Sequence, residues 1–266
     1  MEPKTGALGI AIAATRKLIA TQDLAPSSIE VLVVVSQNPD RNIPHMSAEI
    51  HGAIGMSSNC ACFDIGLGCS GFVYGLAAIS SFMKSSGFSR GILVSADPYS
   101  KIVDENDKST SLIFGDAATA TLLDKNAVFD LGQFSFGTLG KEAHNLTCDN
   151  GLLKMNGRGV FNFAVSRIPD DIRIVAEKNN ISLESIDLFI LHQGSKYIVE
   201  TIADRLEIPR EKVPFSAGDY GNTVSSSIPI ILANSLTETA HKTIALSGFG
   251  LGLSWASTIL KRRAES

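Results

Sequence analysis

Apolar runs rich in β-branched residues alternate with helix-like segments along most of this chain, and this alternation strongly limits the folds open to it. Such an order is typical of α/β proteins and argues against an all-α or all-β fold. We expect strands at residues 29–36, 60–66, 91–97, 115–125, 128–140, 186–194, 242–250 and 253–262. We expect helices near the N-terminus and at residues 44–55, 71–87, 160–181, 195–208 and 222–240. Gly87 should end its helix, and Pro169 should kink the helical segment that contains it or start a new one.

The two halves of the chain repeat one order of elements. In each half a glycine-containing turn opens a helix of small residues, and two strands follow that helix. The turn contains Cys69 in the first half and Asn222 in the second. We therefore expect two fused α/β halves, residues 1–126 and 127–266, packed as one body with the two turns facing each other. The functional site should lie between those turns.

Composition excludes several classes of protein. A chain of 266 residues with 44% hydrophobic and 19% charged residues can bury a large core. A net charge of −4 and a pI of 5.7 give no basic stripe for nucleic acid, and the apolar runs are too short to cross a bilayer. The N-terminal residues lack a signal-peptide layout, so we expect a cytoplasmic protein. The four cysteines have neither the number nor the spacing of a disulfide framework or a zinc site, which predicts reduced thiols and no metal.

Cys69 is the candidate nucleophile. It lies in the stretch DIGLGCSGFVYGL, where glycines bracket a turn between a strand and a helix. A thiol at a helix start faces the positive end of the helix dipole, which should lower its pKa. The glycines allow a tight turn and close approach of a thioester. Cys60, Cys62 and Cys148 lack this setting, and we interpret them as small buried apolar residues.

His192 and Asn222 are the candidate partners of that thiol. His192 ends the apolar run LFILH, at a strand end where functional side chains of α/β proteins converge. Asn222 precedes a helix at a glycine turn, so it could cap the helix, act in catalysis, or do both. The remaining histidines fall in expected loops or on helix faces, and we interpret them as surface or packing residues: His45, His51, His144 and His241.

In this order and spacing, five segments resemble beta-ketoacyl-acyl carrier protein synthase III of the thiolase-fold condensing enzymes: GCSGFVYGL, LIFGDAATATLL, LHQGS, YGNTVSSSIP and SGFGLGLSW. The resemblance implies a thiolase-like αβαβα arrangement of duplicated halves. It makes Cys69 the acylated nucleophile, and His192 and Asn222 the pair that binds the malonyl thioester carbonyl. It places the oxyanion hole for the acyl group at the backbone N–H groups of Cys69 and Leu251.

The same resemblance implies substrate-binding roles for Ile43, Lys108, Ser195 and Phe249. Ile43 stands where the family often has an aromatic residue that reaches into the partner's acyl tunnel, and Lys108 where an arginine lies near the coenzyme A phosphates. Leu251 and Leu253 replace what are commonly glycine and phenylalanine, which should alter the tunnel wall.

The resemblance starts near Gly6, so the family's usual first strand and helix have no counterpart in this sequence. We therefore expect one sheet to lack a strand and the pantetheine channel to lack part of its wall.

The predicted reaction is decarboxylative condensation of acyl-coenzyme A with malonyl-acyl carrier protein, without a cofactor, by a homodimer. An acidic carrier protein needs a basic patch, for which the candidates are Lys196, Arg205, Arg210 and Lys212. Three alternatives remain open. The order Cys, His, Asn also occurs in papain-like proteases, although the doubled α/β pattern argues against them. A relative could pass the acyl group to oxygen or nitrogen without decarboxylation, or the chain could be an inactive paralogue.

Overall fold

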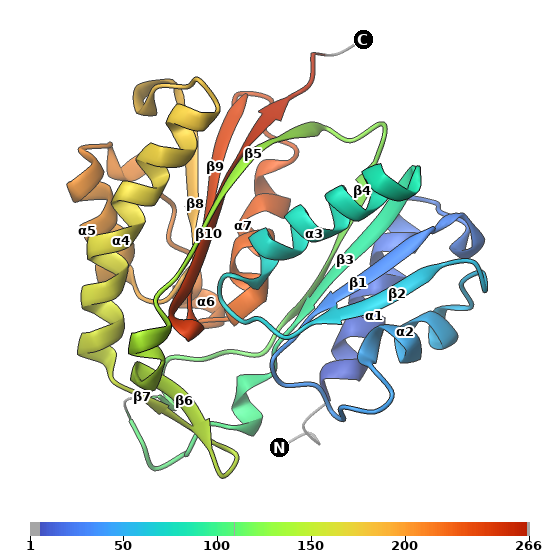
Figure 1. Cartoon of the computed structure of the whole chain (residues 1–266), viewed down its shortest axis with the longest axis horizontal. Coiled ribbons are helices and arrows are strands. Elements are labelled where there is room, and N and C mark those ends of the chain that lie inside the picture. The colour runs from blue at the N-terminus through green and yellow to red at the C-terminus, as the bar shows by residue number, and fades with distance from the viewer. Residues whose placement is uncertain (1–5, 109, 265–266) are drawn as a thin grey trace.

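The computed structural model describes residues 6–108 and 110–264, and Figure 1 shows the path of the chain. The first half contains the helices α1 (Ala7–Thr21), α2 (Met46–Ile54) and α3 (Gly71–Ser86) and the strands β1 (Val31–Val35), β2 (Ala61–Ile65), β3 (Arg90–Ala96) and β4 (Ala118–Asp124). The helices of the second half are α4 (Gly157–Lys178), α5 (Lys196–Leu206), α6 (Ala217–Tyr220) and α7 (Ser227–Ser235). Its strands are β5 (Phe129–Thr138), β6 (Leu146–Asp149), β7 (Leu152–Met155), β8 (Leu188–Leu191), β9 (Thr243–Gly250) and β10 (Ser254–Arg262). The boundary predicted at residue 126 falls in the connection between β4 and β5.

The larger strands form two four-stranded sheets. The first has the order β2-β1-β3-β4, with β1 parallel to both neighbours and β4 antiparallel to β3. The second has the order β5-β10-β9-β8, with β8 parallel to β9 and β10 antiparallel to β9 and β5. The first sheet thus has two parallel pairs and one antiparallel pair, and the second has one parallel pair and two antiparallel pairs. β5 covers the outer edge of β10, whereas no strand within residues 6–108 and 110–264 pairs with the outer edge of β4.

Helices and sheets alternate in layers (Figure 1). α3 and α7 lie between the sheets, where Phe72 and Ile228 share a core with residues of β1, β8 and β9. α1 and α2 cover the outer face of the first sheet around Leu32 and Ile92. α4 and α5 cover the outer face of the second sheet in a third core. This is the αβαβα arrangement that the sequence predicted.

The central strands are apolar throughout because both of their faces are covered. All five residues of β1 are buried, and their alternate side chains enter the core between the sheets and the core under α1 and α2. The four residues of β8 are buried in the same way. Buried parallel strands need such continuous apolar runs. The sequence runs 29–36 and 186–194 therefore predict these two strands correctly.

Two local features differ from the sequence expectation or were absent from it. α4 runs unbroken through Pro169, so no new segment begins there. Proline removes one backbone hydrogen bond from the helix, and burial of the helix face that carries Ile168 and Ile172 outweighs this loss. The β6–β7 hairpin was not predicted, although Asn150 and Gly151 at its turn are a strong hairpin signal. Gly87 has a positive φ of 70° and ends α3 as expected.

Candidate active site

Cys69 lies in the turn between β2 and α3, one residue before the N-cap Ser70. The glycines around it allow close packing rather than unusual dihedral angles. A methyl group added at Gly71 would lie 2.4 Å from Cγ1 of Val35, so α3 can approach the end of β1 only with glycine there. A methyl group added at Gly250 would lie 2.7 Å from Sγ of Cys69. The end of β9 therefore touches the thiol directly.

The environment of Cys69 does not lower the pKa of its thiol. Burial raises the pKa to about 12, and the nearby carboxylate of Asp97 acts in the same direction. The backbone N–H groups of Leu251 and of Cys69 itself face the sulfur and oppose this rise. The expectation of a lowered pKa is therefore wrong for the free protein, because loss of hydration outweighs the favourable helix start. These two N–H groups are the ones that the resemblance to the synthase family implies as an oxyanion hole.

His192 follows β8 and is buried. Its backbone N–H donates to the carbonyl oxygen of Ser247 at 2.9 Å, which continues the pairing with β9. Its Nδ1 lies 2.9 Å from Oγ of Ser227, and its ring stands edge-on to Phe249 with the centroids 5.6 Å apart. Burial lowers the pKa of the imidazole to about 4, and the carbonyl of Val224 opposes this only in part. His192 is therefore a neutral hydrogen-bonding group near pH 7.

The backbone of Asn222 is hydrogen-bonded through both its N–H group and its carbonyl group. Its backbone N–H donates to the carbonyl of Ile113 at 2.8 Å, and its own carbonyl accepts from the N–H of Gly115 at 3.0 Å. Its side-chain oxygen accepts from the N–H of Val224 at 2.9 Å, two residues further along, and so closes a local turn just before the 3₁₀ segment η6 (Val224–Ser226), whose N-cap is Thr223. With the oxygen used in this way, the amide nitrogen is the end that can donate to a substrate. The capping role suggested for Asn222 is therefore wrong for η6, and the turn that it forms instead is compatible with a catalytic role.

Val224 is the point at which the three predicted residues meet. It shares a buried cluster with Cys69, its carbonyl faces His192, and its N–H binds the side chain of Asn222. Its φ of 54° is rare for a β-branched residue. Such a backbone conformation persists only where the surroundings enforce it, and it is common at functional sites. The structure thus brings Cys69, His192 and Asn222 together from both halves.

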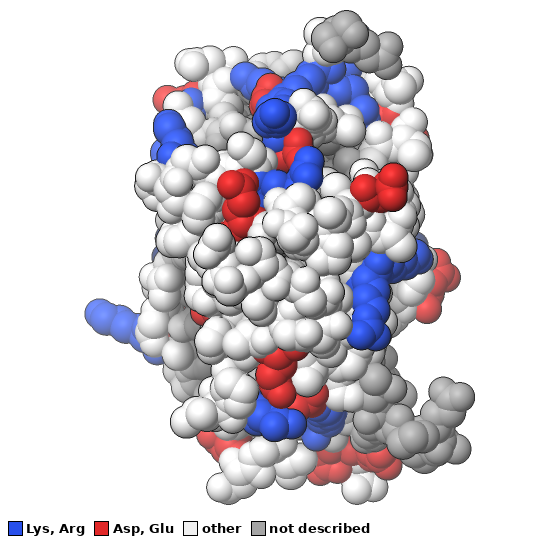
Figure 2. All heavy atoms as spheres, turned by 90° about the vertical axis from the view of Figure 1, so that its right-hand side faces the viewer, with Lys and Arg blue, Asp and Glu red and all other residues white. Residues whose placement is uncertain are grey.

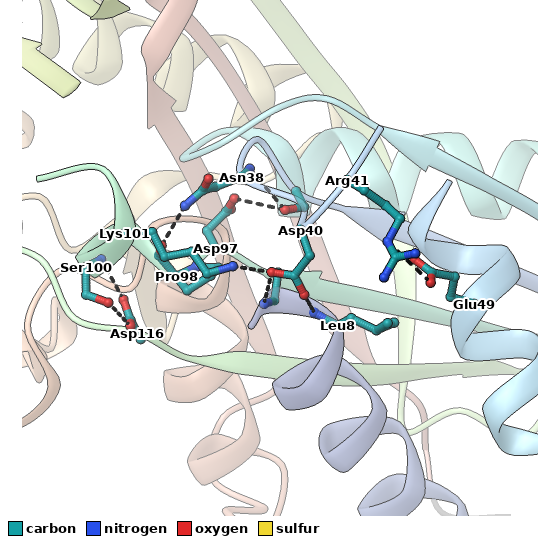
Figure 3. Close-up of polar contacts among 12 residues, drawn as sticks. Leu8, Asn38, Asp40, Arg41, Glu49, Asp97, Pro98, Ser100, Lys101 and Asp116 are labelled. Atoms are coloured by element: carbon teal, nitrogen blue, oxygen red, sulfur yellow. Dashed lines mark hydrogen bonds and ion pairs between the residues drawn. The ribbon is translucent and has the colours of Figure 1, made fainter. Parts of the chain in front are cut away.

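Asp97 is a site residue that the sequence analysis did not select. It follows β3, is fully buried, and accepts hydrogen bonds from the N–H of Gln37 at 2.8 Å and from Oγ of Ser225 at 2.5 Å. Figure 3 shows it beside Asn38 and Pro98 at one end of the first sheet. Burial raises its pKa to about 6. The signal was present in the sequence, because Asp97 ends an apolar strand just as His192 does.

The predicted substrate-binding residues divide into two groups. Phe249 contacts His192, and Ser195 accepts from the N–H of Ile198 at 3.2 Å as the N-cap of α5. Lys108 and Ile43 are exposed on loops, and Ile43 is 89% exposed. A surface hollow of about 350 Å³ lies near Ile43, but none of Cys69, His192 and Asn222 lines it.

The other cysteines differ from one another. Cys60 is buried as expected, Cys62 is half-buried, and Cys148 is exposed, which contradicts its interpretation as a buried residue. Cys148 lies on the short β6–β7 hairpin, where the solvent side of the strand is open. A hydrogen bond with Cys60 lowers the pKa of Cys62 to about 7.

The predicted basic patch is largely neutralised. Lys196 lies 3.8 Å from Glu200, and Arg210 pairs with Glu200 and Asp204 at 3.5 and 2.7 Å. Lys212 donates to the carbonyls of Glu184 and Ile186, while Arg205 is exposed.

The described residues contain neither a metal-binding cluster nor a membrane-spanning helix. Within residues 6–108 and 110–264, three or more His, Cys, Asp or Glu side chains do not gather at any point where they could hold a metal. No helix in the same part of the chain has both the length and the apolar character of a membrane span.

Comparison with known proteins identifies the family. The profile of 3-oxoacyl-[acyl-carrier-protein (ACP)] synthase III matches residues 63–140, and its C-terminal profile matches residues 176–262. Beta-ketoacyl-[acyl-carrier-protein] synthase III of Lactobacillus helveticus is 35% identical over 92% of this chain and 81% of the relative. The enzyme of the same name from Streptococcus equi subsp. equi is 32% identical over 95% of this chain and 83% of the relative.

Solved structures agree with this result. The 3-oxoacyl-[acyl-carrier-protein] synthase III from Aquifex aeolicus superposes with a TM-score of 0.91 at 29% identity, covering 97% of this chain and 85% of that one. The 3-oxoacyl-(acyl-carrier protein) synthase from Burkholderia xenovorans gives 0.91 at 30% identity, covering 98% and 81%. The matched segments contain Cys69, His192 and Asn222, and the chain belongs to the 3-oxoacyl-[acyl-carrier-protein] synthase III family.

Proposed function

We propose that this chain condenses an acyl group from acyl-coenzyme A with malonyl-acyl carrier protein, using Cys69, His192 and Asn222. The convergence of these three side chains at Val224 carries the proposal. They come from positions far apart in the sequence, and their chemistry is complementary. Cys69 supplies a nucleophile, and the other two supply neutral donors.

In the first half-reaction, the sulfur of Cys69 attacks the thioester carbonyl of acyl-coenzyme A. The N–H groups of Cys69 and Leu251, which face the sulfur, stabilise the oxyanion of the tetrahedral intermediate. Coenzyme A leaves as its thiol, having received the proton that Cys69 loses. Because the resting thiol is protonated, binding of the thioester and these donors must favour attack, rather than a preformed thiolate.

In the second half-reaction, malonyl-acyl carrier protein binds with its thioester oxygen facing Nε2 of His192 and the amide of Asn222. Loss of carbon dioxide leaves an enolate, whose negative oxygen two neutral donors stabilise. The enolate carbon attacks the acyl group on Cys69, and the cysteine sulfur leaves. The products are 3-oxoacyl-acyl carrier protein and carbon dioxide. We propose that this reaction takes place in the cytoplasm, where its thioester substrates are used.

We expect the carrier protein to bind near α5. Fewer than the four predicted basic side chains are available there to attract it. Lys196 and Arg210 are already paired with acids, so exposed Arg205 is the stronger attractor for an acidic partner. We expect Arg205→Glu to raise the KM for malonyl-acyl carrier protein several-fold and leave the acylation of Cys69 unchanged.

The proposed assembly is a homodimer formed through the first sheet. β2 is an edge strand, and Ile43 projects from a nearby loop with 89% of its surface exposed. Figure 2 shows a wide uncharged area across the face on the right of Figure 1. An uncharged face beside a strand edge suits pairing with a second copy. Light scattering of the purified protein tests this, and Ile43→Asp should weaken the dimer.

Intact-protein mass spectrometry after incubation with a series of acyl-coenzyme A thioesters tests the function. We expect one acyl adduct, which Cys69→Ala abolishes and His192→Ala retains. Malonyl-acyl carrier protein should then remove the adduct with release of carbon dioxide in the native enzyme, but not in His192→Ala or Asn222→Ala. Absence of an adduct from every donor in folded protein would refute the proposal. Transfer of the adduct without carbon dioxide would indicate an acyltransferase of another kind.

A further inference from the structure

Asp97 contacts two active-site segments that come from different halves of the chain. We propose that Asp97 is a positioning residue that holds the Asn222–Ser227 segment against the turn of Cys69. The inference rests on the condensing function proposed above for its catalytic consequence.

The carboxylate is saturated with donors. Oδ1 accepts from the N–H of Gln37 at 2.8 Å and faces Oγ of Ser36 at 3.4 Å. Oδ2 accepts from Oγ of Ser225 at 2.5 Å. None of the ion pairs found among residues 6–108 and 110–264 involves Asp97. It is therefore a buried anion stabilised by hydrogen bonds and not by a cation, which is a costly arrangement.

On one side, Asp97 supports the turn of Cys69 through Gln37. A methyl group added at Gly68 would lie 2.3 Å from Oε1 of Gln37, so this side chain packs directly under the residue before Cys69. The same oxygen accepts from the hydroxyl of Tyr99 at 3.2 Å, and Tyr99 shares a buried cluster with Cys69. Gln37 is thus fixed by backbone and side chain together.

On the other side, Asp97 fixes the segment that carries the two donors. Ser225 directly follows Val224, whose backbone binds Asn222 and faces His192. Ser226 reinforces the attachment, because its hydroxyl donates to the carbonyl of Ser95 at 3.1 Å. Removing the carboxylate would free η6 on the side facing the first sheet. A small displacement there moves both donors away from the thioester oxygen.

The test measures two properties in the full-length protein with Asp97→Asn and Ser225→Ala, using Asp130→Asn as a matched surface control. The first is acylation of Cys69 by acyl-coenzyme A, followed by intact-protein mass spectrometry. The second is decarboxylation of malonyl-acyl carrier protein, with kcat and KM determined separately. Asp97→Asn and Ser225→Ala should each decarboxylate at least about tenfold more slowly, with the loss in kcat and little change in KM or in acylation.

The outcomes separate the inference from the proposed function. An unchanged decarboxylation kcat in both variants would overturn the positioning role. If the native enzyme does not decarboxylate, the proposed function fails, and backbone hydrogen exchange of residues 222–227 then tests the positioning role. This exchange should be faster in Asp97→Asn and Ser225→Ala than in the native protein and in Asp130→Asn, and unchanged exchange would overturn the inference. If Asp97→Asn does not fold, Ser225→Ala decides, because it removes the hydrogen bond between Asp97 and this segment.

Discussion

Nδ1 of His192 lies 2.9 Å from the hydroxyl of Ser227, whose oxygen is also 3.0 Å from the carbonyl oxygen of Val224. The hydroxyl has one proton, and these two acceptors compete for it. Donation to Nδ1 leaves the proton of the imidazole on Nε2, where it can reach a thioester. Donation to the carbonyl leaves Nε2 as an acceptor. Ser227 therefore controls which form of His192 the substrate meets.

Ser227→Ala should slow malonyl decarboxylation by about tenfold, because Nδ1 then donates to the carbonyl of Val224 and Nε2 loses its proton. Acylation of Cys69 should be little changed. Single-turnover measurements of the two half-reactions check this, with Ser235→Ala as a control at the far end of α7. Equal loss in both half-reactions would contradict the tautomer argument.

Iodoacetamide near pH 7.5 should alkylate Cys62 well before Cys69. The pKa of Cys62 is lowered to about 7 and that of Cys69 is raised to about 12, so their thiolate fractions differ by roughly a thousandfold or more. Acyl-coenzyme A should label only Cys69, because binding directs that reaction. Peptide mapping after timed exposure distinguishes the sites. Early alkylation of Cys69 would contradict the buried, protonated thiol.

The stability of the protein should decrease on acidification below about pH 6.5 through His192. Its pKa is lowered from 6.5 to about 4 in the folded protein. Between these two pH values the imidazole is therefore protonated in the unfolded chain and neutral in the native state. This difference in pKa contributes about 3 kcal/mol to the free energy of unfolding near pH 7, and the contribution is lost below pH 4. Urea unfolding of the native protein and His192→Gln between pH 4 and 7 measures it as a difference. A constant difference would refute the lowered pKa.

Asp97 should act in the opposite direction. Its folded pKa of about 6 exceeds the value of 3.8 for a free carboxyl, so its stabilising contribution is complete below pH 3.8 and is lost as the pH rises through 6. Relative to Asp97→Asn, the free energy of unfolding of the native protein should fall by about 3 kcal/mol between pH 4 and 7. The slope against pH, measured by urea unfolding, tests the sign. An increase with pH in the free energy of unfolding relative to Asp97→Asn would contradict the raised pKa of Asp97.

Gly250→Ala should abolish acylation of Cys69, because the added methyl group would lie 2.7 Å from both Cβ and Sγ of Cys69. Gly218→Ala is the matched control, since a methyl group there meets no atom within 4 Å. Intact mass after incubation with acyl-coenzyme A gives the readout, and circular dichroism confirms the fold. A normal adduct in Gly250→Ala would show that the thiol can move away from β9.

Much of the site was predictable because a strand end is visible in a sequence. His192 ends a continuous apolar run, and Cys69 lies in a glycine turn before a helix, so local pattern selected both. Asp97 carries the same signal as His192 and was missed only because its partners, Gln37 and Ser225, are 60 and 128 residues away. Such pairings leave no periodicity in the chain.

The succession of strands and helices and their packing as two α/β halves follow from the sequence, and glycine spacing makes Cys69 the candidate nucleophile, since apolar periodicity and glycine spacing are local properties. Only the tertiary structure decided the ionisation of the site. Burial and the neighbouring Asp97 raise the pKa of Cys69 against the helix start, and burial keeps His192 neutral. Desolvation depends on everything packed around a group, including residues from the other half of the chain, and a local sequence pattern therefore cannot specify it.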